Sequence, residues 1–254
     1  LMRGHQYCRD LGVAPLDFAY TPDQFGHIAA LPMLMSGFGL KAGVVWRGTQ
    51  DETHPAQFVW VGPDGSRMVY CKLMDKGSYS PFDFFVRRPI RDAEFSDESF
   101  KVHFEPYFEE ERSRGAAPVA LMLDAIDHQR PPLEMPRLFD ELRRRYPDIE
   151  FIWEGLDGFG REMLAHQDAL PERAGELRAP VRDSKRGPQY LIAHTLSSRL
   201  DIKQANDRCQ ALLEKWVEPY VLFARMNGHE PIMAYLDKAW EYLLKNHPHD
   251  SICG

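Results

Sequence analysis

Carboxylate and imidazole side chains are grouped in three short runs of this 254-residue sequence, each beside the expected end of a strand or helix. Such side chains act as general acids and bases, as nucleophiles and as metal ligands. The runs are Asp23-Gln24-Phe25-Gly26-His27, Asp124-Ala125-Ile126-Asp127-His128-Gln129 and His247-Pro248-His249-Asp250.

Each run also has a purely structural interpretation. Asp23 could accept hydrogen bonds from the free backbone N–H groups of a helix that begins near Ile28. Asp127 could be a loop carboxylate paired with a nearby arginine, and His249 could cap a helix or be a fully hydrogen-bonded histidine. Considered one at a time, the three runs do not decide between structure and chemistry.

The first two thirds of the chain read as alternating strands and helices. We expect strands at 17–20, 42–46, 57–61, 67–72, 118–123 and 149–153, and helices at 28–35, 97–114 and 136–146. Pro63-Asp64-Gly65 predicts a hairpin turn between two of the strands. Repeated strand–helix units predict an α/β fold with a mainly parallel, barrel-like sheet. Catalytic groups in such barrels lie just after the strands, where Asp23 and Asp127 are expected.

The composition changes near residue 178, where a segment at 178–190 combines prolines, a glycine and several charges as linkers do. Amphipathic helices are expected beyond it at 203–227 and 232–244. We therefore predict two domains, an α/β catalytic domain at 1–180 and a helical domain at 181–254 that resembles a three-helix bundle.

Composition excludes several classes of function. The formal net charge of −7 disfavours nucleic-acid binding, because phosphate-binding surfaces need clustered Lys and Arg. No apolar run approaches the roughly 18 to 20 residues of a membrane span. The four cysteines lack CxxC spacing, which favours a reducing compartment and predicts a cytoplasmic protein.

Taken together, the motifs resemble those of glycoside hydrolase family 38 α-mannosidases, in the order in which that family has them. The run Tyr20-Thr21-Pro22-Asp23-Gln24-Phe25-Gly26-His27 resembles the family's nucleophile motif, and Trp46-Arg47-Gly48 resembles its next strand end. Asp127-His128-Gln129 resembles the acid/base segment. Ser197-Ser198-Arg199-Leu200 resembles the start of the helical domain, and His249-Asp250-Ser251-Ile252-Cys253-Gly254 resembles a zinc-binding motif.

The resemblance implies retaining, zinc-dependent hydrolysis of terminal α-mannosidic linkages in an oligosaccharide or a small α-mannoside. Asp23 would be the nucleophile and Asp127 the acid/base, on carboxyls about 5 to 5.5 Å apart. Asp23 and His249 would be Zn²⁺ ligands. The sugar pocket would be lined by Phe25, Arg47, Tyr79 and Asp250. Asp124 is the nearest candidate for a like charge that keeps Asp127 protonated.

One departure from the family concerns the metal site. The family has two further zinc ligands in a His-x-Asp motif before the nucleophile, whereas His5 is followed here by Gln6-Tyr7. A catalytic zinc normally has three protein ligands, so the site is expected to be incomplete. We expect an internal part of a longer enzyme, with weak zinc binding, low activity and an incomplete sheet. The open sheet edge would favour a homo-oligomer.

Two other functions fit parts of the pattern. A zinc-dependent carbohydrate deacetylase would use an aspartate and histidines on a metal without needing Asp127. A carbohydrate-binding remnant of a mannosidase would bind sugar without turnover.

Overall fold

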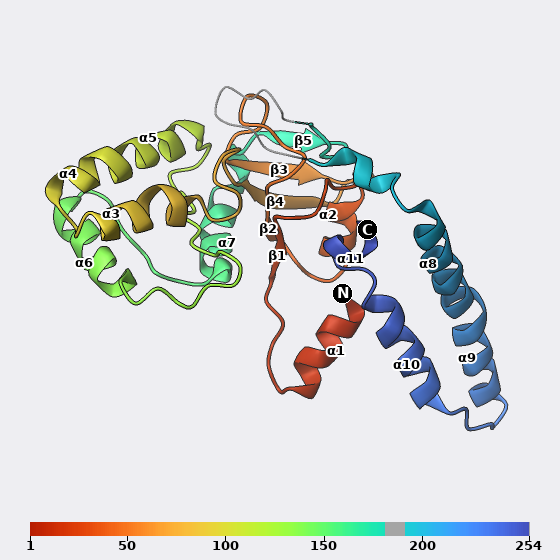
Figure 1. Ribbon diagram of the computed structural model, residues 1–254. Helices are drawn as coiled ribbons and strands as arrows, with labels where there is room; N and C mark the ends of the chain where they lie inside the picture. Colours follow the sequence, from red (N-terminus) through yellow and green to blue (C-terminus); the bar gives the residue numbers. More distant parts are fainter. Residues whose placement is uncertain (181–190, 254) are drawn as a thin grey trace. The chain divides into compact units, whose positions relative to one another are not determined.

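The computed structural model describes residues 1–180 and 191–253, and the expected linker at 178–190 lies almost entirely outside these ranges. The chain forms two compact units, Leu1–Leu191 and Ile192–Gly254. Each unit has its own core, and the first contains the sheet (Figure 1).

A five-stranded mixed sheet is the centre of the first unit, with strand order β1-β2-β4-β3-β5. Its strands are β1 (Phe18–Thr21), β2 (Ala42–Val45), β3 (Gln57–Val61), β4 (Arg67–Lys72) and β5 (Glu172–Ala174). Three pairings are parallel, and β3 pairs with β4 in an antiparallel hairpin. The predicted hairpin is confirmed, and Gly65 adopts the positive φ of 83° that its turn requires.

Both faces of the sheet are buried, as the apolar character of the strands predicts. Alternate side chains of a strand point to opposite faces, so Val44 joins one core cluster and Val45 another. The helix α7 (Leu156–Ala165) packs against β1, β2 and β4, and α2 (Leu31–Ser36) packs against β4. This packing fixes the ends of β1 and β2, from which Asp23 and Arg47 follow.

A second group of helices in the first unit has its own aromatic core, and Figure 1 shows it beside the sheet. Its elements are η1 (Asp83–Arg87), α3 (Arg88–Asp92), α4 (Asp97–Ser99), η2 (Phe100–Phe104), α5 (Glu105–Arg114) and α6 (Met135–Arg145). The helix predicted at 97–114 is thus continuous, and its π-helical turn η2 ends just before Pro106. A proline has no N–H to donate and clashes with the preceding turn, and a π-helical turn accommodates it.

Two predicted strands are wrong, those at 118–123 and 149–153, because neither segment pairs with the sheet. In both segments a side chain from elsewhere donates a hydrogen bond to a backbone carbonyl instead. Gln57 donates to the carbonyl of Val119 at 2.8 Å, and Arg143 donates to the carbonyl of Phe151 at 2.8 Å. Helix α1 (Met2–Asp10), η3 (Gln167–Ala169), α7 and β5 were not expected.

The second unit is helical, as predicted. It contains η4 (Ala193–Leu196), α8 (Leu200–Leu212), η5 (Leu213–Val217), α9 (Glu218–Met226), α10 (Met233–Leu244) and α11 (His249–Cys253). Its core clusters Leu213, Leu236 and Leu243, which α8 to α10 bring together. Pro219 again follows a π-helical turn, η5, within one long helix.

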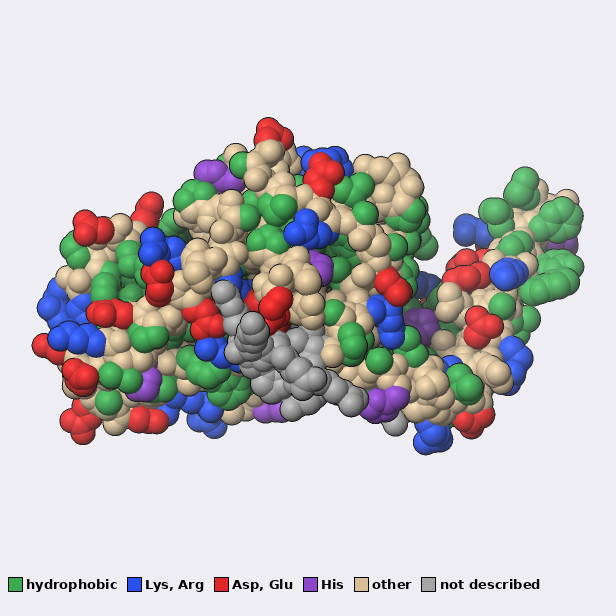
Figure 2. All heavy atoms as spheres, turned by 90° about the horizontal axis from the view of Figure 1, so that it is seen from above, with side chains coloured by type: hydrophobic (Ala, Val, Ile, Leu, Met, Phe, Trp, Pro, Cys, Tyr) green, Lys and Arg blue, Asp and Glu red, His purple; other side chains and the backbone are tan. Residues whose placement is uncertain are grey.

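Charged side chains of both signs are interspersed on the face of the first unit seen in Figure 2. A nucleic-acid interface would gather basic groups on one face. Neither the mixed charges of this face nor the net charge of −7 has that character. Among the helices of residues 1–180 and 191–253, none combines the length and the apolar character that crossing a bilayer requires.

Candidate active site

The carboxylate of Asp23 lies just beyond β1 and is paired with Arg47, which lies just beyond β2. Arg47 Nε donates to Asp23 Oδ1 at 2.6 Å, and Nη2 lies 2.5 Å from the same oxygen. Parallel pairing of β1 with β2 brings these two strand ends together. The side chain of Asp23 is 23% exposed, so a carboxylate oriented by an arginine remains open to solvent.

Aromatic rings hold the guanidinium of Arg47 in place. It lies over the Phe25 ring at 5.0 Å and over the Trp46 ring at 4.7 Å. Such cation–π contacts stabilise a guanidinium whose hydration is partly lost. Arg47 and Phe25, both predicted to line a sugar pocket, therefore meet at Asp23.

The second predicted catalytic carboxylate, Asp127, is exposed on a turn and accepts a hydrogen bond from the hydroxyl of Tyr79. The Tyr79 ring packs edge-on against Trp46 with centroids 6.3 Å apart. Tyr79 therefore links Asp127 to the aromatic side chains around Arg47.

The electrostatics of two tyrosines indicate that Asp23 and Asp127 lie in one cluster. Partial burial raises the pKa of Tyr79, and hydrogen bonding to Asp127 and the negative charges of Asp127 and Asp23 raise it further. The pKa of Tyr20 is raised by burial first, and then by Asp127 and Asp23. The negative charges of both carboxylates favour the protonated form of each phenol, so each tyrosine hydroxyl remains a hydrogen-bond donor at neutral pH.

The other two predicted site residues belong to the second unit. His249 begins α11, and its Nε2 lies 3.5 Å from Asp250 Oδ1. Five predicted residues thus gather in the first unit, namely Asp23, Phe25, Arg47, Tyr79 and Asp127.

The structural alternatives for Asp23 and Asp127 do not match the contacts. The residue before α2 is Ala30, which makes no side-chain cap, and Asp23 pairs with Arg47 instead. The carboxylate that pairs with a buried arginine is Asp124, which accepts from Arg87 Nε at 2.6 Å. Asp124 is the nearest candidate in the sequence for a like charge beside Asp127, and its ion pair with Arg87 largely offsets that charge.

Sequence reasoning missed three contributors to this region: Tyr20, Ser80 and Arg87. Tyr20 stands at the end of β1 in the nucleophile motif, and its position was the available signal. Nothing local marks Ser80 or Arg87, because their partners lie 45 and 37 residues away.

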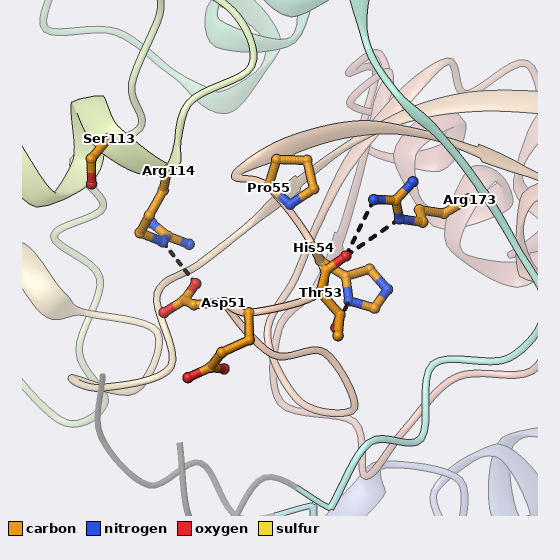
Figure 3. Close-up of a pocket in the computed structure, with 8 residues that line it drawn as sticks. Asp51, Thr53, His54, Pro55, Ser113, Arg114 and Arg173 are labelled. Atoms are coloured by element: carbon orange, nitrogen blue, oxygen red, sulfur yellow. Dashed lines mark hydrogen bonds and ion pairs between the residues drawn. The ribbon is translucent and has the colours of Figure 1, made fainter. Parts of the chain in front are cut away.

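A polar depression of about 260 Å³ lies elsewhere in the first unit (Figure 3). Its lining residues are Asp51, Glu52, Thr53, His54, Pro55, Ser113, Arg114 and Arg173. Figure 3 shows Arg114 and Asp51 pointing toward each other, and Arg114 Nε donates to Asp51 Oδ1 at 2.7 Å. Arg173 donates to the carbonyl of Thr53. These cations already have partners, so we assign the depression a structural role.

Similarity to known proteins agrees with this geometry. The family model described as the N-terminal domain of glycosyl hydrolases family 38 matches residues 1–145. A curated protein of Halalkalibacterium halodurans, provisionally named a mannosylglycerate hydrolase, is 26% identical over the whole chain. The crystal structure of an α-mannosidase from Enterococcus faecalis matches the whole chain with a TM-score of 0.83 and 26% identity.

The chain spans 28% of the length of each of these two proteins. The family model nevertheless covers more than half of the present residues, including the segments around Asp23, Arg47, Tyr79 and Asp127. The fold, the cluster of site residues and the sequence match agree, and the chain belongs to glycosyl hydrolase family 38.

Proposed function

We propose that this protein hydrolyses terminal α-mannosidic linkages with retention of configuration, with Asp23 as nucleophile and Asp127 as acid/base. One observation carries the proposal. Tyr79 donates a hydrogen bond to Asp127 and packs edge-on against Trp46. The Trp46 ring in turn lies against the guanidinium of Arg47, which pairs with Asp23. Glycoside hydrolysis requires two carboxyl groups that flank the scissile bond.

In the first step, an Asp23 oxygen bonds to the anomeric carbon as the glycosidic C–O bond breaks. Asp127 gives its proton to the departing oxygen. In the second step Asp127 takes a proton from water, and the water oxygen replaces Asp23 at the anomeric carbon. Arg47 orients the Asp23 carboxylate through the contacts of its Nε and Nη2 with Oδ1.

Zinc belongs to the proposal as a prediction from the family resemblance. Within residues 1–180 and 191–253, no three His, Cys, Asp or Glu side chains lie together in a way that could hold a metal ion. Those residues do not fit a complete catalytic zinc site, so no step above passes through zinc. The assignment of Asp23 and His249 as two ligands, and of Asp250 to the sugar pocket, stays a prediction.

The substrate class follows from the relatives. One is named as an α-mannosidase and the other as a mannosylglycerate hydrolase, so both mannose-containing oligosaccharides and a small anionic α-mannoside are candidates. Assays with a mannobiose and with mannosylglycerate would rank the two.

Covalent trapping tests the mechanism, with the protein at its natural length. A 5-fluoro-α-mannosyl fluoride reacts when Asp23 bonds to C1 and fluoride leaves, and the C5 fluorine slows hydrolysis of the ester. We expect one sugar per protein on the peptide containing Asp23, detected by mass spectrometry after digestion. Asp23→Asn should prevent labelling.

Asp17→Asn is the matched control, because Asp17 is an exposed carboxylate beside the same strand and should not affect labelling. Labelling of a different carboxylate would contradict the assignment of Asp23. A deacetylase or a carbohydrate-binding remnant would release no fluoride and form no glycosyl ester.

A further inference from the structure

The segment leading to Asp127 is held by side chains rather than by strand pairing. Residues 118–126 belong to no strand of the sheet. Gln57 donates to the carbonyl of Val119 and accepts from the N–H of Ala116, both at 2.8 Å. A strand in the interior of a sheet is located by a ladder of backbone bonds, whereas this segment depends on a few individual contacts.

Ser80 makes one of these contacts close to the acid/base. Its side chain is fully buried, and Oγ accepts from the N–H of Ala125 at 3.1 Å. Its neighbour Tyr79 donates to Asp127 itself. Residues 79 and 80 therefore hold the loop at two points that are two residues apart.

Arg87 holds the same loop from the other side. It is 5% exposed, and its Nε donates to Asp124 Oδ2 at 2.6 Å while its Nη1 donates to Glu134 Oε1 at 2.5 Å. It also pairs with the buried Asp83. Burial alone would lower the pKa of Arg87, but these carboxylates raise it above its ordinary value. The ion pairs tie the loop to η1 and to the start of α6.

We propose that Ser80 and Arg87 are positioning residues that hold the loop at Ala125 and Asp124 so that the Asp127 carboxyl reaches the glycosidic oxygen. This inference rests on the proposed role of Asp127. The turn at Asp127 is exposed, and His128 has a positive φ of 57°, which side-chain-bearing residues rarely adopt, so contacts outside the turn must hold it. A displacement of about 1 Å at a catalytic group is enough to cost on the order of a hundredfold in rate.

Leaving-group dependence provides the test, because only poor leaving groups need a proton from Asp127. The variants are Ser80→Ala and Asp124→Ala, made in the protein at its natural length. Arg87→Met is less informative because it leaves the buried Asp83 without this partner and can prevent folding. Asp124→Ala keeps the bonds of Arg87 to Asp83 and Glu134.

We expect each variant to lower kcat/KM for an alkyl α-mannoside by about tenfold to a hundredfold, within the range of general acid catalysis. For 2,4-dinitrophenyl α-mannoside, kcat/KM should fall less than about threefold. The kcat for this substrate should fall, because hydrolysis of the glycosyl enzyme still needs Asp127 as a base. Azide, which attacks the glycosyl enzyme without a general base, should restore that kcat. Asp127→Ala serves as the reference for complete loss of the acid/base.

Ser99→Ala is the matched control, since Ser99 is also a buried serine but its hydroxyl bonds to the carbonyl of Ser96 and not to the loop. Equal losses on both substrates, or unchanged activity on the alkyl mannoside in both variants, would overturn the positioning role. Full activity of Asp127→Ala on the alkyl mannoside would instead refute the proposed function.

Discussion

At the scale of single residues, the site depends on contacts of carboxylates with a guanidinium and a phenol, and of the guanidinium with aromatic rings. Arg47 is paired with Asp23 while aromatic rings lie against its guanidinium, so the arginine is fixed on two sides. Tyr79 holds the Asp127 carboxylate by donating a hydrogen bond to it. The predicted side chains Asp23, Arg47 and Asp127 thus act as members of one cluster rather than as isolated ligands.

His27 closes the nucleophile motif and has a different role from Asp23. It is 6% exposed, and its Nε2 meets no hydrogen-bonding partner among the described residues. Burial lowers its pKa to about 4 from an ordinary value of 6.5. The native state therefore holds His27 neutral in a pH range in which the unfolded chain would protonate it.

The pH dependence of stability should reveal this buried histidine. Its contribution is present above pH 6.5 and is lost as pH falls toward 4, since the unfolded state then binds the extra proton. At about 1.4 kcal/mol per pKa unit, the wild type should lose about 2 to 3 kcal/mol more than His27→Gln between pH 7 and pH 4.5. Urea denaturation followed by tryptophan fluorescence measures the difference.

The exposed His229 provides the control, because His229→Gln should show the same loss as the wild type. If wild type and His27→Gln lost equal stability on acidification, the burial of an uncharged His27 would be contradicted.

At the scale of elements, the close approach of β1, β2 and β4 depends on Gly43. A Cβ built on this residue would lie 2.9 Å from the carbonyl oxygen of Ala19 and 2.8 Å from Cε1 of Tyr70. Ala19 and Tyr70 are its partners in the two neighbouring strands. The same pairing places Asp23 beside Arg47.

Gly43→Ala should therefore destabilise the first unit by about 1 to 3 kcal/mol, the usual cost of overpacking a core. Thermal and urea unfolding followed by circular dichroism would measure it. The control is Gly4→Ala in α1, where the added methyl meets no atom within 4 Å and should be neutral or stabilising by up to about 1 kcal/mol. Unchanged stability in Gly43→Ala would contradict the tight strand packing.

At the scale of the whole molecule, the site residues are divided between two compact units. Asp23, Arg47, Tyr79 and Asp127 belong to Leu1–Leu191, whereas His249 and Asp250 belong to Ile192–Gly254. The predicted domain boundary at 180/181, the cytoplasmic location and the homo-oligomer stay predictions.

Zinc binding by residues 1–254 should be weak, because the resemblance assigns two ligands to this chain and a catalytic zinc normally has three. We expect a Kd above about 10 μM, equivalent to about −7 kcal/mol or weaker. Isothermal titration calorimetry would measure it, and Asp23→Ala and His249→Ala should each reduce the remaining binding. His229→Ala is the control. Nanomolar binding that neither substitution weakens would contradict the ligand assignment.

Local signals in the sequence were enough for much of the fold. The hairpin of β3 and β4 has the predicted bounds, because short apolar runs and a turn with proline and glycine act over a few positions. The continuous helices from Asp97 to Arg114 and from Leu200 to Met226 were recognisable from their polar and apolar patterns, even though each contains a proline. The motif order was enough to indicate the family and the candidate residues Asp23 and Asp127.

Only the tertiary structure decided how the acid/base segment is held. An apolar run at 118–123 predicts a strand, but Gln57 and Ser80 bond to the backbone of residues 116–125 in place of a neighbouring strand. Arg87 and Asp124 meet across 37 positions of sequence. Contacts of this kind depend on where the chain returns in space, and neither residue type nor local spacing carries that information.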